Sequence, residues 1–250
     1  MNLDNRSRTK SLLLGLGLGL VASAPVSAAV VMEGTRVVFP GDRREVSVRV
    51  ENQSDTPSLV QAWLDDGDPH ATPASAKAPF VVRPPIFRID TGRRQVLRLQ
   101  QVGEAPPQDR ESLYWFNLRE VPATGSSEQS SDDASLHLIV RTRVKVFYRP
   151  KGLKAGDAAK APHQLQWSVS SNNGGGALTA FNPTPYHVNL NRIDAKQGAL
   201  TIGDGIVRPF SSAQFPLTHS QMADIQQHVS FEYINDHGGR VTLKTPIEPR

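Results

Sequence analysis

The chain has 250 residues, which is long enough for one large domain or for two of ordinary size. It contains no cysteine, so disulfides, thiolate metal sites and cysteine nucleophiles are all excluded. Glycine and proline supply 19 residues each and aromatic residues only 6%, a composition typical of a turn-rich β protein. The formal net charge of +4 is too small for the dense basic surface of a nucleic-acid-binding protein.

The first 28 residues have the features of a secretory signal peptide. Arg6, Arg8 and Lys10 precede an apolar run over residues 12–22, and small residues follow up to Ala28. A membrane anchor is the alternative, but the uncharged run is shorter than the roughly 20 residues of a spanning helix. We therefore predict cleavage after Ala28, export to a bacterial periplasm or a similar exterior, and no membrane insertion of the mature chain. The removed segment carries three basic residues and one acidic residue, so the mature net charge becomes +2.

Residues 29–150 are predicted to form the first β domain. In residues 45–51 valines alternate with polar residues, which is the period-two pattern of a half-buried antiparallel strand. Residues 58–66, 95–102 and 112–121 have similar patterns and are bounded by turn residues. Several short strands at this spacing predict a β-sandwich.

Residues 151–250 are predicted to form a second β domain. Residues 151–162 are rich in Lys, Ala, Gly and Pro and lack apolar periodicity, which indicates a linker or a crossover. Beyond them, alternating segments flank turns at residues 172–176 and 235–239, and a short helix is expected over residues 220–228. The fold class is therefore all-β, with two sandwich domains of ordinary size.

The segment over residues 135–149 is unusually long for a single strand. It alternates strictly for about 15 residues, where a mean strand has 5–6, and would extend over roughly 50 Å. One row of side chains is mainly apolar and begins with Leu136, Leu138 and Val140. Part of this row could be an exposed edge that a partner strand covers, or the strand could be shared between two sheets with the whole row internal. The pattern alone leaves both possibilities open.

Seven short motifs follow one another in a fixed order along the mature chain. They are residues 34–39 (GTRVVF), 61–63 (QAW), 83–85 (RPP), 107–122 (PQDRESLYWFNLREVP), 143–150 (RVKVFYRP), 182–186 (NPTPY) and 233–239 (YINDHGG). In these motifs and their order the chain resembles the PapD-like periplasmic chaperones of the chaperone–usher pilus pathway. The resemblance implies two immunoglobulin-like β-sandwich domains in an L or boomerang arrangement.

The resemblance implies a chaperone that binds, folds and caps pilus (fimbrial) subunits and delivers them to an outer-membrane usher. A subunit of this pathway lacks the last strand of its own sandwich, and the chaperone lends it one by donor-strand complementation. In register with the family, the lent side chains are those of Leu136, Leu138 and Val140, spaced two residues apart on one face. An edge strand of this kind could also pair with a second copy of the chain, which would give a self-capping dimer.

The resemblance also implies roles for five charged residues. Arg36 and Lys145 match the two basic residues that hold the C-terminal carboxylate of the subunit. Glu111, Arg149 and Asp236 match an inter-domain salt-bridge cluster that holds the angle between the domains. Without the resemblance, each of these residues would be interpreted as an ordinary solvated or surface-paired charge.

Other features of the sequence have simpler interpretations. Trp63, Trp115 and Tyr148 alternate within strands, so we interpret them as core residues and not as ligand sites. The short Ser-rich loop over residues 123–133 and the lack of cysteine resemble the short-loop branch of the family, which serves rod-forming adhesive pili.

The sequence lacks the usual motifs of enzymes. Its seven histidines are scattered, and neither a Gly-x-Ser-x-Gly nor a His-Glu-x-x-His motif occurs. We therefore expect no enzymatic activity, no cofactor and no bound metal, and the mature charge disfavours a nucleic-acid partner. The alternative function is that of a secreted β-sandwich carbohydrate-binding module, which would need an exposed platform of aromatic side chains.

Overall fold

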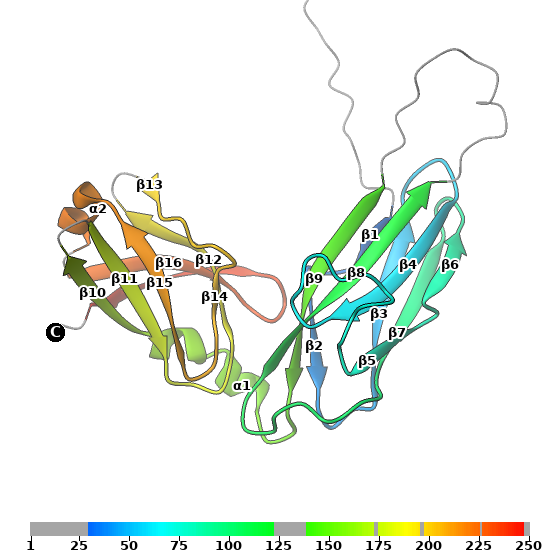
Figure 1. The fold of residues 1–250 in the computed structure, drawn as a ribbon, viewed down its shortest axis with the longest axis horizontal. Helices are drawn as coiled ribbons and strands as arrows, with labels where there is room; N and C mark the ends of the chain where they lie inside the picture. The colour runs from blue at the N-terminus through cyan, green and yellow to red at the C-terminus, as the bar shows by residue number, and fades with distance from the viewer. Residues whose placement is uncertain (1–29, 123–138, 173–174, 196–197, 226, 248–250) are drawn as a thin grey trace, which may run out of the picture.

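The computed structural model shows two β lobes joined end to end (Figure 1). It describes residues 30–122, 139–172, 175–195, 198–225 and 227–247. The predicted signal peptide, the predicted loop over residues 123–133 and the predicted donor residues Leu136 and Leu138 lie outside the described residues.

The N-terminal lobe is a sandwich of two sheets. The first sheet has the order β1-β3-β7-β5, with bounds Val30–Met32 (β1), Glu45–Asn52 (β3), Arg94–Gln101 (β7) and Phe80–Arg83 (β5). The second has the order β2-β9-β8-β4-β6, with bounds Arg36–Pro40 (β2), Val140–Arg149 (β9), Ser112–Pro122 (β8), Ser58–Asp65 (β4) and Ile86–Ile89 (β6). The strands predicted at residues 45–51, 58–66, 95–102 and 112–121 are therefore present.

The period-two pattern of these strands places one row of side chains between the two sheets. Val48 and Val50 of β3 are buried, while Ser47 and Arg49, which alternate with them, are exposed. From the opposite sheet, Phe39 of β2 joins them, and its ring lies 5.1 Å from that of Phe80 in an edge-on contact. Apolar alternation on both sheets thus produces a single core for this lobe.

The C-terminal lobe is a second sandwich built in the same way. One sheet has the order β10-β11-β15, with bounds Gln166–Asn172 (β10), Gly175–Asn182 (β11) and Ser211–Leu217 (β15). The other has the order β13-β12-β16-β17, with bounds Gly198–Ala199 (β13), Val188–Ala195 (β12), His228–Ile234 (β16) and Arg240–Pro246 (β17), and β14 (Ile206–Val207) pairs with β12. Trp167 is fully buried at the centre, with its ring 5.0 Å from that of Phe231.

The sequence-based expectation about helices was only partly correct. The segment predicted to be a linker contains a short helix, α1 (Ala155–Ala158), and a turn of 3₁₀ helix (Ala161–Gln164). The helix predicted over residues 220–228 is shorter, because α2 (His219–Asp224) ends before β16 begins at His228. Thr218 and Gln221 form a capping box that starts α2 one residue earlier than predicted.

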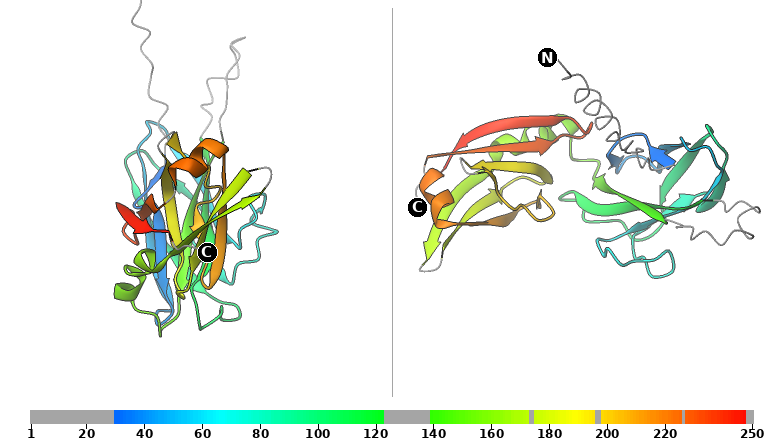
Figure 2. Two further views of the ribbon diagram at one scale, coloured as in Figure 1. Left: turned by 90° about the vertical axis from the view of Figure 1, so that its left-hand side faces the viewer. Right: turned by 90° about the horizontal axis from the view of Figure 1, so that it is seen from above.

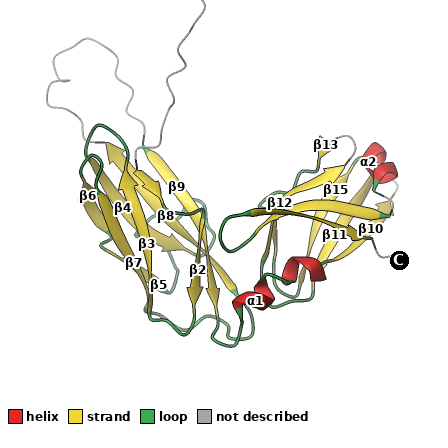
Figure 3. Ribbon diagram, turned by 180° about the vertical axis from the view of Figure 1, so that it is seen from behind, coloured by secondary structure: helices red, strands yellow, loops and turns green. Residues whose placement is uncertain are grey.

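The two sandwiches are inclined to each other and meet at the end where α1 lies (Figure 1). The view from above (Figure 2, right) and the view from behind (Figure 3) show the same two separate lobes. This is the bent arrangement of two immunoglobulin-like domains that the sequence predicted. None of the helices in the described part of the chain is long and apolar enough to cross a membrane.

Candidate functional site

The two basic residues predicted to form the anchor, Arg36 and Lys145, lie side by side where the lobes meet. Strand β2 pairs in parallel with β9, and Arg36 and Lys145 are direct partners in this ladder. They are 109 positions apart in the sequence, so only the parallel pairing of the two strands brings them together.

Both cations make hydrogen bonds to uncharged oxygen atoms of the C-terminal lobe. The Arg36 Nη1 donates to the carbonyl of Ile234 at 3.1 Å. The Lys145 Nζ donates to Asn189 Oδ1 and to the carbonyl of Asp204, the latter at 3.3 Å. Within the described residues neither cation forms an ion pair, and the buried Nε of Arg36 has no hydrogen-bond partner. The donor capacity of this pair is therefore incompletely used.

The surroundings disfavour the charged forms of both residues. Burial lowers the pKa of Arg36, and the charge of Asp236 offsets this only in part. Burial, followed by the neighbouring charge of Arg36, lowers the pKa of Lys145 to about 8, against a smaller opposing effect of Asp204. Two partly desolvated cations without an anion form a site that a carboxylate would complete with charge-assisted hydrogen bonds.

Strand β9 leads away from this cation pair with one edge open. Strand β8 pairs with β9 along Val140–Tyr148, but β2 covers the other edge only from Lys145 onward. In the described part of the chain, no strand pairs with Val140–Val144 on that side. The side chain row that is buried at Val146 becomes exposed toward Val140, which is 38% exposed. The open edge thus combines free backbone groups with an apolar row.

The three residues predicted as an inter-domain cluster, Glu111, Arg149 and Asp236, are in direct contact. The Arg149 Nε donates to Glu111 Oε1 at 2.7 Å, and its Nη1 donates to Asp236 Oδ2 at 2.8 Å. Burial by itself would lower the pKa of Arg149, but the hydrogen bonds and charges of Asp236 and Glu111 outweigh burial, so its pKa is raised. This cation is fully neutralised, with partners from both lobes.

Further contacts of Glu111 tie the lobes together. Its second carboxylate oxygen accepts from the backbone N–H of His187 at 2.8 Å, and its own N–H donates to the carbonyl of Pro185 at 2.9 Å. The sequence interpretation missed His187 and also Asn189, the partner of Lys145. The sequence signal for Asn189 is weak: it is an amide between the apolar residues Val188 and Leu190, and its burial is known only from the structure.

The prediction that the three aromatic residues belong to the core was correct for Tyr148 and Trp63, which are both buried, and wrong for Trp115. Tyr148 is buried within the hydrophobic cluster between the sheets. Trp63 and Trp115 lie on the opposite face of their sheet, where Trp63 is buried and Trp115 is only partly covered. The guanidinium of Arg141 lies 4.9 Å from the ring of Trp63, and that of Arg143 lies 4.2 Å from the ring of Trp115.

A pocket of about 730 Å³ lies between the lobes beside the cation pair. Trp115 and Arg143 line it from the N-terminal lobe, and Asp204, Arg208 and Phe210 from the C-terminal lobe. In the residues that the structure describes, no group of three or more His, Asp or Glu side chains is placed to hold a metal ion.

The fold and the site together define a two-domain immunoglobulin-like protein with a cation pair at the domain junction and an open strand edge beside it. Residues 29–154 match the family model of pili and flagellar-assembly chaperones, PapD N-terminal domain. Residues 160–245 match that of the pili assembly chaperone PapD, C-terminal domain. The chain therefore belongs to the PapD family of pilus chaperones.

Relatives with established names and structures support this assignment. The probable fimbrial chaperone YadV of Escherichia coli is 39% identical over 217 residues, which cover 86% of this chain and 88% of YadV. The crystal structure of YadV matches with a TM-score of 0.70 and 34% identity, over 88% of this chain and all of that one. A structure of the Salmonella enterica SafA pilin in complex with the SafB chaperone matches with a TM-score of 0.72 and 26% identity, over 90% and 99% of the chains.

Proposed function

We propose that the protein is a periplasmic chaperone that captures pilus subunits by donor-strand complementation and delivers them to an outer-membrane usher. In this proposal residues 1–28 are a cleaved signal peptide, residues 29–150 form the chaperone domain with the donor strand, and residues 151–250 form the second domain. Family membership supports the chaperone class, and the SafA–SafB complex shows that a protein similar to this chain binds a pilin.

The observation that carries the proposal is the cation pair of Arg36 and Lys145 at the base of an open strand edge. A subunit chain ending at this pair would place its terminal carboxylate on two cations that lack an anion. Its last residues would then extend along Val140–Val144, where the backbone of β9 has one side free. Fixing the carboxylate would also fix the register, because a slip of one residue turns the apolar row outward.

The donor row in this proposal consists of Leu136, Leu138 and Val140. Their spacing of two residues places them on one face of an extended strand, where they would fill successive gaps in the core of the subunit. Val140, the described member of the row, is exposed in the free protein. The paired cluster around Arg149 would hold the angle between the domains and with it the position of the anchor.

Recovery of the protein from its own periplasm tests the proposal. We expect a tagged chain to co-purify in equal amounts with a protein that mass spectrometry identifies as a pilus subunit. Deletion of the gene should also remove pili from the cell surface. A monomer or dimer without any subunit, or a bound oligosaccharide in place of a protein, would overturn the proposal, and the oligosaccharide would favour the carbohydrate-binding alternative.

Substitutions in the donor row give a sharper test. Leu138→Asp and Val140→Asp should each reduce subunit recovery while leaving the melting temperature nearly unchanged, because these side chains would be buried only in the complex. Val96→Asp is the matched control, since Val96 is similarly exposed but lies on β7 of the other sheet. Equal recovery with all three variants would contradict the assignment of the donor row, and unfolding of Leu138→Asp would show that the row is internal core.

A further inference from the structure

The open part of β9 receives less support from the core of its own lobe toward its first residue, since Val144 is partly buried against that core and Val140 is exposed. Over Val140–Val144 only β8 pairs with it in the described part of the chain, and the row that faces the core side is exposed at Val140. Ile139, just before the strand, is 64% exposed. A strand segment with one neighbour and little apolar burial should fray, so another set of contacts must hold it extended.

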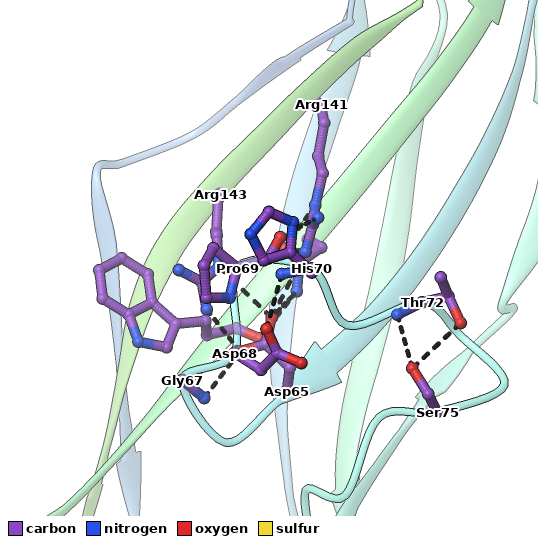
Figure 4. Close-up of polar contacts among 11 residues, drawn as sticks. Asp65, Gly67, Asp68, Pro69, His70, Thr72, Ser75, Arg141 and Arg143 are labelled. Carbon is purple, nitrogen blue, oxygen red and sulfur yellow. Dashed lines mark hydrogen bonds and ion pairs between the residues drawn. The ribbon is translucent and has the colours of Figure 1, made fainter.

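That set of contacts lies on the opposite face of the sheet and centres on Asp65, the last residue of β4 (Figure 4). The side chain of Asp65 is 0% exposed. It accepts from Arg143 Nη2 at 2.5 Å and from the amide of Asn117 at 2.8 Å, and Arg141 lies 3.6 Å away. Asn117 in turn accepts two hydrogen bonds from the Arg141 guanidinium, at 2.8 and 3.0 Å.

The network also connects the open strand with the loop that follows β4. The Asp65 Oδ1 accepts from the backbone N–H of Gly67 at 2.8 Å. The Arg141 Nη1 donates to the carbonyl of Pro69 at 2.6 Å (Figure 4). Both arginines of the open part of β9 are therefore held at their guanidinium ends, although Arg143 is 78 and Arg141 76 positions from Asp65 in the sequence.

Each of the two guanidinium groups also contacts an aromatic ring. Trp115 lies under Arg143 and Trp63 under Arg141, as described above. The buried carboxylate, the amide and the two rings come from β4 and β8, which are inner strands of the sheet. The network thus ties alternate residues in the open part of β9 to inner strands of the sheet, and leaves the free backbone edge and the exposed Val140 on the other face uncovered.

We propose that Asp65 is a positioning residue that holds the open half of β9 in an extended conformation, ready to pair with a subunit strand. The inference rests on the proposed function for the identity of the partner. Asp65 does not contact the partner; it acts through Arg141 and Arg143. Because the strand is already ordered, the subunit does not need to order it during capture, and less of the binding free energy is lost to conformational entropy.

Hydrogen exchange in the free protein tests the inference without any subunit. In Asp65→Asn the buried charge is lost, and those backbone amides of Val140–Val144 that are hydrogen-bonded to β8 should exchange about tenfold faster, the effect expected for one charged hydrogen bond. The amides of Val146–Arg149, held by β2 and β8, should be unchanged. Glu45→Gln is the matched control, because it removes a carboxylate that pairs with Arg98 on the other sheet at 2.9 Å.

Substitutions of Arg143 separate positioning from a general loss of stability. Arg143→Lys retains a charge for Asp65 and should restore most of the protection, whereas Arg143→Gln should reproduce the loss seen with Asp65→Asn. Unchanged exchange over Val140–Val144 in both Asp65→Asn and Arg143→Gln would overturn the inference. If Asp65→Asn does not fold, the two Arg143 variants decide the question by the same measurement.

The rate of subunit capture tests whether the extended conformation of the strand matters for function. With the subunit recovered by the wild-type protein as the probe, Asp65→Asn should slow association about tenfold, while Glu45→Gln should have no effect. Association at the wild-type rate despite faster exchange would refute a role in capture. Failure of the wild-type protein to recover any subunit would refute the proposed function instead, and the exchange result would stand independently of it.

Discussion

The two cation sites at the domain junction differ in whether carboxylates neutralise the cation, and this difference distinguishes a structural site from a candidate binding site. Arg149 has a carboxylate from its own lobe and another from the other lobe, Glu111 and Asp236. Arg36 and Lys145, only a few positions along the same paired strands, have carbonyl and amide oxygens as partners. The first site is electrostatically complete, and the second has unused donors and a lowered pKa at both residues.

The comparison shows how a single strand can contain both kinds of site. Side chains at odd positions of β9 project to one face of the sheet, so four cations lie along the same face: Arg141, Arg143, Lys145 and Arg149. The acidic residues on neighbouring strands and in the other lobe decide which of them is neutralised. Only Lys145 of these four lacks an ion pair within the described residues. The unneutralised position is the one available to a ligand.

Removing the cation of the Glu111–Arg149–Asp236 cluster should have the largest effect, and this effect should be on stability. Arg149→Met leaves the buried carboxylate of Glu111 without its cation, so we expect the free energy of unfolding to fall by about 3–5 kcal/mol. Urea denaturation of the free protein measures this. The matched control is Arg98→Met, which removes an exposed pair with Glu45 and should cost less than about 1 kcal/mol. Equal losses for the two variants would contradict the structural role of the cluster.

Breaking the open site should affect binding and leave stability nearly unchanged. Arg36→Ala and Lys145→Ala should each weaken subunit binding by about 100-fold, as expected for one partner of a desolvated charged hydrogen bond, and the double variant should abolish recovery. Recovery from the periplasm measures binding, and thermal unfolding checks that the variants are folded. Normal recovery with the double variant would show that this pair is not the anchor.

The pH dependence of capture depends on the charge of Lys145. Its pKa is about 8 in the free protein, and a bound carboxylate would raise it. Below pH 8 the ammonium is already present, whereas above pH 8 binding must take up a proton, so affinity should fall about tenfold between pH 7 and pH 9. Titration of binding against pH measures this. In Lys145→Arg the profile should be flat over this range, because a guanidinium keeps its proton.

Giving Lys145 a carboxylate partner should have the smallest effect on subunit binding. Asn189→Asp gives Lys145 a carboxylate partner in place of an amide oxygen, which would compete with the subunit. We expect binding to weaken about fivefold, the value of a pair worth about 1 kcal/mol, and the fall in affinity to move to higher pH. Tighter binding in this variant would show that the neutral partner is not needed to keep the lysine available.

Local patterning was enough to predict most of the fold. Alternation located the strands of both lobes, because burial of one sheet face imposes a period of two on the sequence. The short helix α1 was missed because its four residues lack apolar periodicity and no side chain caps its start. The bounds of α2 differ from the prediction because they depend on a capping box and on where the next strand begins. Trp115 was assigned to the core because alternation shows that two residues share a face but not which face is covered.

The candidate site was only partly accessible from the sequence. Matches to the family motifs selected Arg36, Lys145 and the three residues of the cluster, because each lies inside a recognisable motif. Asp65 and Asn189 lie outside that selection, although both are polar residues in strands with buried neighbours. Their partners are distant in the chain, so no local pattern indicates what they bind.

The sequence by itself determined the class of fold, the family and the types of residue present at the domain junction. These properties depend on local periodicity and on motifs that can be compared position by position. The tertiary structure alone decided which charges are neutralised and which remain open, because that depends on distances between residues far apart in the chain. The parallel pairing of β2 with β9 and the approach of the second lobe set those distances. As a result, Lys145 has an amide oxygen as its partner and no ion pair within the described residues, whereas Arg149 is neutralised by two carboxylates.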